Sequence, residues 1–205
     1  MKPLISFVVT YYNEPYALLR ACIESILALN LSSDEAEILV VEDGCEHKMQ
    51  DKVCSLSPLV GYVCQEHAGL SVARNTGISC SHGEYIQFVD ADDCLEPSAY
   101  NAVLDHLRSR RDDAVMFRMT TKQGGKSGRL TAKHITGKDF LQRHNLRAAA
   151  WGYAFRRDIL GSLRFSPGHS GRHSPDARGC QSSRMFLHAP EKLQRTGSTP
   201  DDPFP

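Results

Sequence analysis

Residues 85–93 read Tyr-Ile-Gln-Phe-Val-Asp-Ala-Asp-Asp, an apolar run that ends in acidic side chains. The apolar run over residues 85–89 is typical of a buried strand, and three carboxylates follow it at Asp90, Asp92 and Asp93. Two upstream runs have the same design. Residues 4–9 lead into Thr10-Tyr11-Tyr12-Asn13-Glu14, and residues 37–41 lead into Glu42-Asp43. Polar side chains therefore follow each of these predicted strands at its carboxyl end.

Helical patterns separate the strands. After Pro15, residues Leu18, Cys22 and Ile26 recur with the period of a helix, and we expect Asn13 to cap it. Residues 70–79 and 97–110 predict further helices, and residues 60–64 and 114–119 predict further strands. Strands joined by single helices need crossover connections, so we expect an α/β fold with a mostly parallel sheet and helices on both faces.

The last forty residues differ in composition from the rest. Residues 166–205 hold six of the ten prolines and contain no Val, Ile, Tyr or Trp. Such a segment buries too little apolar surface to offset the entropy lost on ordering. We predict one domain over residues 1–165 and a disordered tail over residues 166–205.

Composition excludes several classes of function. The 205-residue chain has 24 Lys and Arg against 24 Asp and Glu, so it lacks the excess positive charge of a general nucleic-acid binder. No apolar run approaches the ~20 residues that cross a membrane. Polar residues from Thr10 onward interrupt the first apolar run, which argues against a cleaved leader and predicts a cytoplasmic location. The seven cysteines form no Cys-x-x-Cys pair, which argues against structural zinc.

The carboxylates indicate a cation site. In open parallel sheets, ligands bind outside the carboxyl ends of the strands. Carboxylates crowded there repel one another unless a cation lies among them, and Mg²⁺ or Mn²⁺ prefers such oxygen ligands together with phosphate. The alternative is a solvated acidic loop that precedes the helix at Pro97.

Four phrases occur in order: SFVVTYYNE at residues 6–14, VVEDG at 40–44, AGLSVARNTGI at 68–78 and QFVDADD at 87–93. Together they make the chain resemble the inverting family 2 glycosyltransferases, which have the GT-A fold of nucleotide-diphospho-sugar transferases. The resemblance covers residues 4–93 and resumes at 151–160 and 163–165.

The resemblance implies roles for individual residues. Asp43 would accept a hydrogen bond from the base, Asp90 would hold the ribose, and Arg74 would approach the base or the diphosphate. Asp92 would coordinate Mn²⁺ or Mg²⁺. The implied nucleotide-binding set is Thr10, Tyr12, Glu14, Asp43, Arg74 and Asp90.

The implied activity is metal-dependent transfer of a sugar, with inversion, from a nucleotide-diphosphate donor, expected to be a UDP-sugar. The acceptor would be a hydroxyl of a glycan or a lipid-linked glycan, in polysaccharide biosynthesis, and peripheral association with a membrane stays open.

The catalytic base is not assigned. The family's acidic pair, expected shortly after residue 165, is missing from residues 166–176. A second hypothesis is therefore a nucleotide-sugar-binding module without catalytic competence. The resemblance ends where the composition changes, so either the reading frame departs from the family near Gly168 or a natural low-complexity tail follows.

Overall fold

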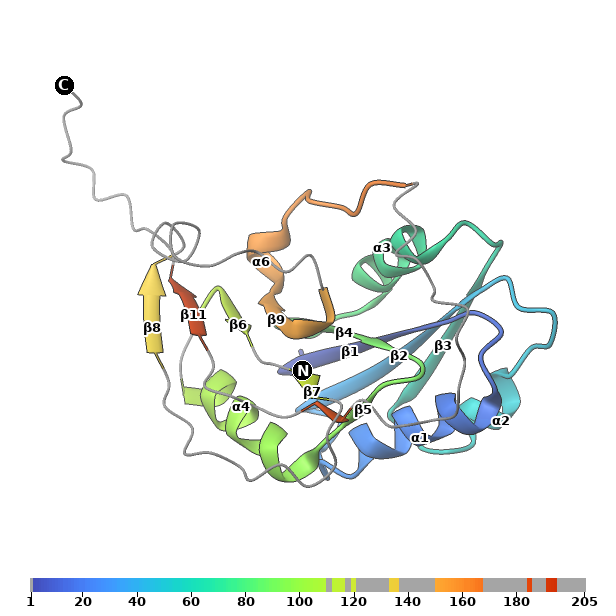
Figure 1. Ribbon diagram of the computed structural model, residues 1–205, viewed down its shortest axis with the longest axis horizontal. Helices are drawn as coiled ribbons and strands as arrows, with labels where there is room; N and C mark the ends of the chain where they lie inside the picture. The colour runs from blue at the N-terminus through green and yellow to red at the C-terminus, as the bar shows by residue number, and fades with distance from the viewer. Residues whose placement is uncertain are drawn as a thin grey trace.

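A computed structural model describes residues 2–109, 112–116, 119–120, 133–136, 150–167, 184–185 and 191–194. Among these residues, eight strands form one sheet in the order β3-β2-β1-β4-β9-β6-β11-β8 (Figure 1). Their bounds are β1 Ile5–Tyr11, β2 Ala36–Asp43, β3 Val60–Gln65, β4 Tyr85–Asp90, β6 Ala114–Met116, β8 Lys133–Thr136, β9 Tyr153–Arg156 and β11 Glu191–Gln194. A smaller sheet has the order β5-β10-β7, with β5 at Cys94–Leu95, β7 at Met119–Thr120 and β10 at Arg184–Met185.

Strands β3, β2, β1 and β4 are parallel neighbours. Strand β9 is inserted between β4 and β6 and pairs antiparallel with both. The chain runs from β1 outward to β2 and β3, and then returns to place β4 on the other side of β1. The predicted α/β architecture with a mostly parallel sheet is confirmed.

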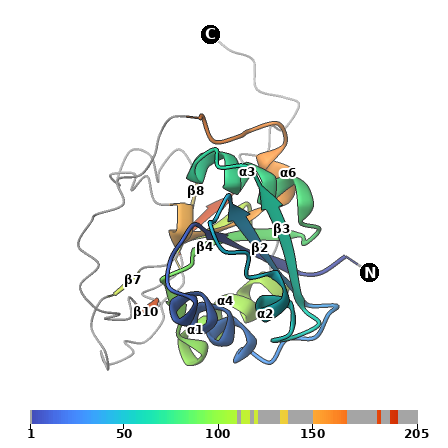
Figure 2. The ribbon, with the colours of Figure 1, turned by 90° about the vertical axis from the view of Figure 1, so that its right-hand side faces the viewer.

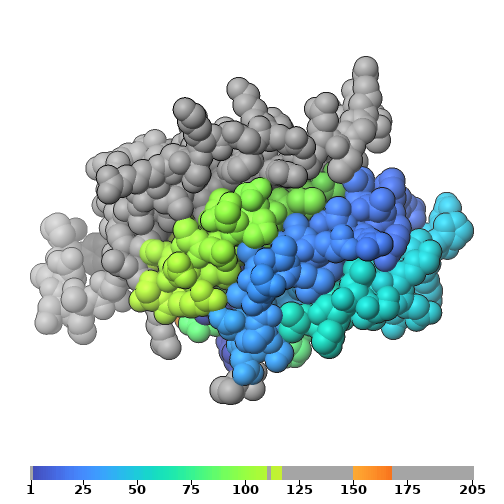
Figure 3. Space-filling model, turned by 90° about the horizontal axis from the view of Figure 1, so that it is seen from below, coloured from blue at the N-terminus to red at the C-terminus, as the bar shows by residue number. Residues whose placement is uncertain are grey.

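Helices cover both faces of the sheet. The helices are α1 (Tyr16–Leu27), α2 (Gln50–Cys54), α3 (Leu70–Cys80), α4 (Pro97–Ser109) and α6 (Arg157–Leu160), and a 3₁₀ turn, η1, spans Ala150–Gly152. Figures 1 and 2 show α1, α2 and α4 on one face and α3 and α6 on the other. Seen from below, the segments that contain α4 (green), α1 (blue) and α2 (cyan) lie side by side across this face (Figure 3).

The residues of β1 explain this layering, because side chains of a strand alternate between its two faces. Ile5, Phe7 and Val9 pack in one core with residues of α1 and α4. Val8 packs in a second core with Ala73 and Ile78 of α3. Every residue of β1 is buried, as expected for a central strand that is covered on both faces.

Gly77 allows α3 to lie close to the sheet. A Cβ atom at this position would overlap the side chain of Val8. The second core therefore depends on a position without a side chain in the helix that crosses it.

The structure corrects several expectations. The N-cap of α1 is Pro15, without a side-chain hydrogen bond, so the predicted capping by Asn13 is wrong. Asn13 instead adopts a left-handed backbone, with φ of 60°, and its side chain accepts a hydrogen bond from Glu46 N. The strand predicted over residues 114–119 is divided between β6 and β7, which lie in different sheets.

The expected tail lies mostly outside the described residues. Within residues 166–205, the structure describes residues 166–167 and the short strands β10 and β11. In the described part of the chain, no helix has the length and apolar character that crossing a membrane requires.

Candidate functional site

The register of the parallel strands brings the predicted site residues to one edge. Thr10 of β1 lies opposite Val41 of β2 and Asp90 of β4. Asp43, two residues beyond Val41, lies opposite Gln65 at the end of β3. The carboxyl ends of four neighbouring strands therefore meet here, where the strand order reverses around β1, which is where open α/β sheets bind ligands.

Alternation along the strands separates these side chains by face. Residues two apart on a strand face the same side of the sheet. Thr10 therefore faces the same side as Val8, Asp43 the same side as Val41, and Asp90 the same side as Phe88. These apolar residues, with Leu39 and Ile86, belong to the core beneath α3. Thr10, Asp43 and Asp90 therefore lie on the α3 side. Glu42 faces the opposite side and accepts a hydrogen bond from Tyr62. Burial, followed by that hydrogen bond, raises the pKa of Tyr62.

Asp43 is 3% exposed, and the chain itself supplies its hydrogen bonds. Its Oδ1 accepts from Gln65 Nε2 at 2.7 Å and from Ala68 N at 2.9 Å, and its Oδ2 accepts from Gly69 N at 2.8 Å. His67 Nδ1 lies 3.0 Å from the same Oδ2. A carboxylate has about four acceptor positions, so a base N–H would compete with His67 for the last one.

Asp43 thereby fixes the entry to α3. Gly69, which precedes the helix, has a φ of 89°, and Gly44 has a φ of 73°. A Cβ atom on Gly44 would collide with the backbone of His67. The end of β2 and the start of α3 are therefore in close contact, and a carboxylate at a helix N-terminus is also favoured by the helix dipole.

Arg74 joins α3 to the end of β4. Its Nη2 lies 2.9 Å from Asp90 Oδ1, and the two side chains are 11% and 31% exposed. The guanidinium carbon lies 5.9 Å from the centre of the Phe88 ring and 5.6 Å from that of Phe165. Among the described residues, Arg74 Nε is a buried donor without a hydrogen-bond partner. Leaving such a donor unpaired costs free energy, so the ion pair with Asp90 and the packing against the two rings must offset that cost.

The turn after β4 concentrates negative charge. Asp93 N donates to Asp90 O at 2.9 Å, which closes the turn. Burial, followed by the charges of Asp90 and Asp92, raises the pKa of Asp93 to about 8, whereas Asp92 is exposed. Among the described residues, no group of three or more His, Cys, Asp or Glu side chains could hold an ion. Mg²⁺ commonly binds proteins through one or two carboxylates plus substrate phosphates, and the exposed Asp92 beside Asp90 fits that type of site.

An aromatic pair lies at the rim. The ring of Tyr12 stacks on that of His67, with centres 4.2 Å apart and an interplanar angle of 25°. Glu14 folds back and accepts from Tyr12 N at 2.7 Å. Tyr12 lies in the loop after β1 and His67 in the loop before α3, so the stacked rings join the two loops. His67 also contacts Asp43, which links this aromatic pair to the end of β2.

Two of these contacts involve residues outside the predicted site. Gln65 and His67 both contact Asp43, and Thr76 Oγ1 donates to Gln65 Oε1 at 2.6 Å. The rule that selected Asp43 also points to Gln65, because Gln65 ends the strand next to β2, whereas His67 lies in the loop that follows. Because β3 ends in the amide of Gln65 and not in a carboxylate, the pattern of acidic strand ends does not include it.

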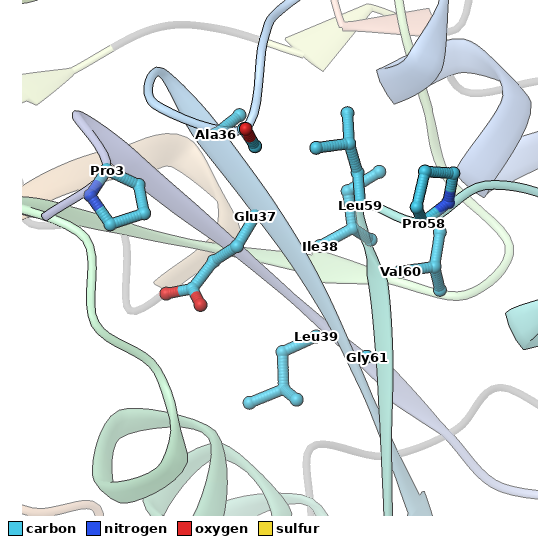
Figure 4. A pocket seen from close by; sticks show the side chains of 10 residues that line it. Pro3, Ala36, Glu37, Ile38, Leu39, Pro58, Leu59, Val60 and Gly61 are labelled. Atoms are coloured by element: carbon cyan, nitrogen blue, oxygen red, sulfur yellow. The ribbon is translucent and has the colours of Figure 1, made fainter. Parts of the chain in front are cut away.

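A separate pocket of about 300 Å³ lies at the opposite end of the strands (Figure 4). Pro3, Ala36, Leu39, Pro58 and Gly61 line it, together with Glu37. The seven residue steps of β2 from Ala36 to Asp43 correspond to roughly 23 Å of extended chain, so this pocket is remote from the site.

The sequence matches the family described as "Glycosyl transferase family 2" over residues 6–165. The chain is 28% identical over 175 residues to the uncharacterized glycosyltransferase EpsJ of Bacillus subtilis (strain 168), which covers 78% of this chain and 50% of EpsJ. It is 31% identical over 173 residues to the uncharacterized glycosyltransferase YibD of Escherichia coli (strain K12), covering 76% and 49%. A chondroitin synthase of Escherichia coli is 32% identical over 109 residues, covering 52% and 16%. The chain thus spans about half the length of EpsJ and YibD.

Solved structures of S. aureus TarS have a similar fold. TarS 1–349 matches with a TM-score of 0.69 at 17% identity, covering 95% of this chain and 60% of that one. The same protein in complex with UDP-GlcNAc gives 0.66 at 16% identity, covering 100% and 62%. At these identities the similarity concerns the fold alone, whereas the family match extends over most of the sequence. The chain therefore belongs to glycosyl transferase family 2 and has the GT-A fold.

Proposed function

We propose that this domain binds a nucleotide-diphosphate sugar at the carboxyl edge of β1, β2 and β4 and transfers the sugar, with inversion, to an acceptor hydroxyl. The observation that carries the proposal is the Arg74–Asp90 ion pair on the same face and edge as Thr10 and Asp43. The family membership supports sugar transfer, and TarS, a protein of the same fold, has been crystallised with UDP and with UDP-GlcNAc. A UDP-sugar is the donor we propose, used in the synthesis of a polysaccharide.

Each residue of the site offers a different part of the donor a chemically suitable contact. Asp90 offers a carboxylate oxygen to a ribose hydroxyl, and Arg74 offers its remaining donors to the diphosphate. Tyr12 offers an exposed ring on which a base can stack. Asp92, which is exposed beside Asp90, would hold Mn²⁺ or Mg²⁺. When bound, such an ion supplies positive charge to the departing diphosphate.

The alternative function is nucleotide-sugar binding without transfer. The observation that favours it is the absence of the family's acidic pair from residues 166–176, because an acceptor hydroxyl needs a general base. The acceptor would be a glycan or a lipid-linked glycan in the first case, and none would be used in the second.

Calorimetric titration with UDP, GDP and ADP, each with and without Mn²⁺, tests the donor site. We expect UDP to bind most tightly and Mn²⁺ to strengthen that binding. Equal weak binding of the three diphosphates would contradict the assignment. Consumption of UDP-GlcNAc with a glycan acceptor then separates the two functions, and the anomeric configuration of the product tests inversion.

The Asp92→Asn variant tests the metal assignment. We expect it to bind UDP with nearly the same affinity whether or not Mn²⁺ is present. Asp34→Asn is the matched control, because Asp34 is exposed in the loop before β2, and it should keep the dependence on Mn²⁺. A full response to Mn²⁺ in Asp92→Asn would move the ion to other residues.

A further inference from the structure

Asn75 on α3 binds a backbone segment that lies 90 residues further along the chain. Its Nδ2 donates to Phe165 O at 2.9 Å, and its Oδ1 accepts from Phe165 N at 2.9 Å. One side-chain amide thus satisfies both backbone groups of Phe165. This two-bond pairing fixes the position and the orientation of that residue against α3.

The ring of Phe165 packs beside two residues of the proposed donor-site region, Phe88 and Arg74. It meets the Phe88 ring edge to face, with centres 5.2 Å apart and an interplanar angle of 87°. The guanidinium of Arg74 lies 5.6 Å from the Phe165 centre and 5.9 Å from the Phe88 centre. Arg74 is therefore held by two rings, and the position of one of them depends on Asn75.

This support matters because an arginine side chain loses much of its rotamer freedom when it is held in one conformation. Phe88 belongs to β4 and is fully buried, so its ring is fixed by the core. Phe165 lies in a segment after α6 and is only partly buried, so its placement relies on the two hydrogen bonds between its backbone and the Asn75 side chain.

We propose that Asn75 is a positioning residue of the donor site, which acts through Phe165 on Arg74 and so on the Arg74–Asp90 pair. The proposal rests on the proposed function, because it assigns Asn75 to the site that binds the nucleotide diphosphate. The coupling between ligand binding and the Phe165 contact acts in both directions. A ligand that holds Arg74 in place therefore also stabilises the contact between α3 and the segment at Phe165. Phe165 therefore serves the donor site, although it lies far along the chain from the proposed nucleotide-binding residues within 10–90.

The first experiment measures UDP affinity in the presence of Mn²⁺ by calorimetry. We expect Asn75→Ala to weaken UDP binding about tenfold, within the usual range of coupling between linked sites. Asn101→Ala is the control, because it makes the same change on an exposed residue of another helix, and its affinity should equal that of the wild type. Wild-type affinity in Asn75→Ala would overturn the proposal.

A double-mutant cycle separates positioning from general stabilisation. If Asn75 acts through Arg74, then Asn75→Ala should weaken UDP binding little further in an Arg74→Gln background. A merely structural role predicts that the two losses add, and additive losses would overturn the proposal. If Asn75→Ala fails to melt cooperatively, Phe165→Leu replaces it, because it removes the ring from the guanidinium and leaves the backbone hydrogen bonds in place.

Hydrogen exchange at the Phe165 amide gives a readout that needs no nucleotide. Exchange should be faster in Asn75→Ala and in Arg74→Gln than in the wild type, and unchanged in Asn101→Ala. Unchanged exchange in Arg74→Gln would contradict the link between Phe165 and Arg74. A wild type that binds no UDP but shows these exchange rates would refute the proposed function and leave the contact network intact.

Discussion

Neighbouring carboxylates of this domain differ in what surrounds them. Glu42 and Asp43 are adjacent in sequence, but Glu42 faces α1 and α2 and bonds to Tyr62, whereas Asp43 faces α3 and holds the loop before it. Asp92 is exposed and Asp93 is buried, although one turn contains both. The sequence alone predicted that these residues gather at one edge. It did not predict their partners, because Gln65, His67 and Gly69 approach Asp43 only once β3 and α3 are in place.

Asp43→Asn tests whether that carboxylate is structural. An amide group there faces at least one of Gln65, Ala68 N and Gly69 N with a donor, so a partly buried N–H loses its acceptor. We expect the free energy of unfolding to fall by about 2 kcal/mol, measured by urea denaturation. Asp34→Asn should change it by less than about 0.5 kcal/mol. Unchanged stability with lost UDP binding would assign Asp43 to base recognition alone.

At the scale of elements, α3 organises the site. Its N-terminal entry is fixed by Asp43, Arg74 reaches Asp90 from its second turn, and Asn75 holds Phe165. Periodicity predicted this helix and the strands β1 to β4 to within about two residues, because each combines an apolar pattern with clear end signals. Helix α2 and strand β9 were not predicted. They are five and four residues long, and β9 owes its place to pairing with β4 and β6.

Gly77→Ala tests the close packing of α3 on β1. Alanine favours a helix over glycine by up to about 1 kcal/mol, but its Cβ would overlap Val8 in the buried core. We expect overpacking to dominate and to lower the free energy of unfolding by roughly 1–3 kcal/mol. The control is Gly61→Ala on β3, where the nearest atom to an added Cβ, Leu39 Cδ1, lies at an ordinary 3.5 Å. Equal stability of the two variants would contradict close packing at Gly77.

Glu37 ties β1, β2 and the loop before β4 together at the other end of the sheet. It accepts from Ser6 Oγ at 2.6 Å, from Gly83 N at 3.1 Å and from His82 N. Burial alone would raise the pKa of Glu37, but these hydrogen bonds outweigh it and hold the pKa below its ordinary value. A lowered carboxyl pKa adds stability that is present above the unfolded pKa of about 4.3 and is lost as the pH falls through the folded value.

Thermal melting of wild type and Glu37→Gln between pH 7 and pH 3 measures this contribution. The wild type should be the more stable protein at pH 7. The difference should shrink toward pH 3, because a carboxylate at position 37 becomes protonated in the wild type, whereas the glutamine of the variant does not titrate. A difference in melting temperature that stays constant with pH would show that ionisation of Glu37 adds nothing to stability.

At the scale of the whole molecule, the composition of residues 166–205 predicts where the chain is cut first. We expect trypsin to cleave after Arg172 or Arg178 before it cleaves within residues 2–109, because so few apolar residues are available to protect that stretch. Mass spectrometry of the early fragments provides the measurement, and digestion in urea, where all sites are open, is the control. A first cut within residues 2–109 would contradict the predicted boundary near residue 165.

The overall architecture and the edge of the sheet that carries the candidate site could be predicted from local patterns, whereas the long-range contacts that support the site could not. Four strand–helix alternations imply a parallel sheet, and the polar ends of the strands imply its active edge. The contacts of Phe165 with Asn75, Arg74 and Phe88 join residues 77 to 91 positions apart, and no local pattern encodes them.

The insertion of β9 beside β4 also sets an order of events during synthesis. Strand β4 leaves the ribosome 66 residues before Arg156, the last residue of its antiparallel neighbour. At 5–20 residues per second, this interval lasts roughly 3–13 s. During that time one row of backbone amides and carbonyls on β4 lacks its native neighbour, and such an edge is a template for pairing between nascent chains. The domain therefore depends on a late-made strand to close the edge of the strand that leads into the acidic turn at residues 90–93.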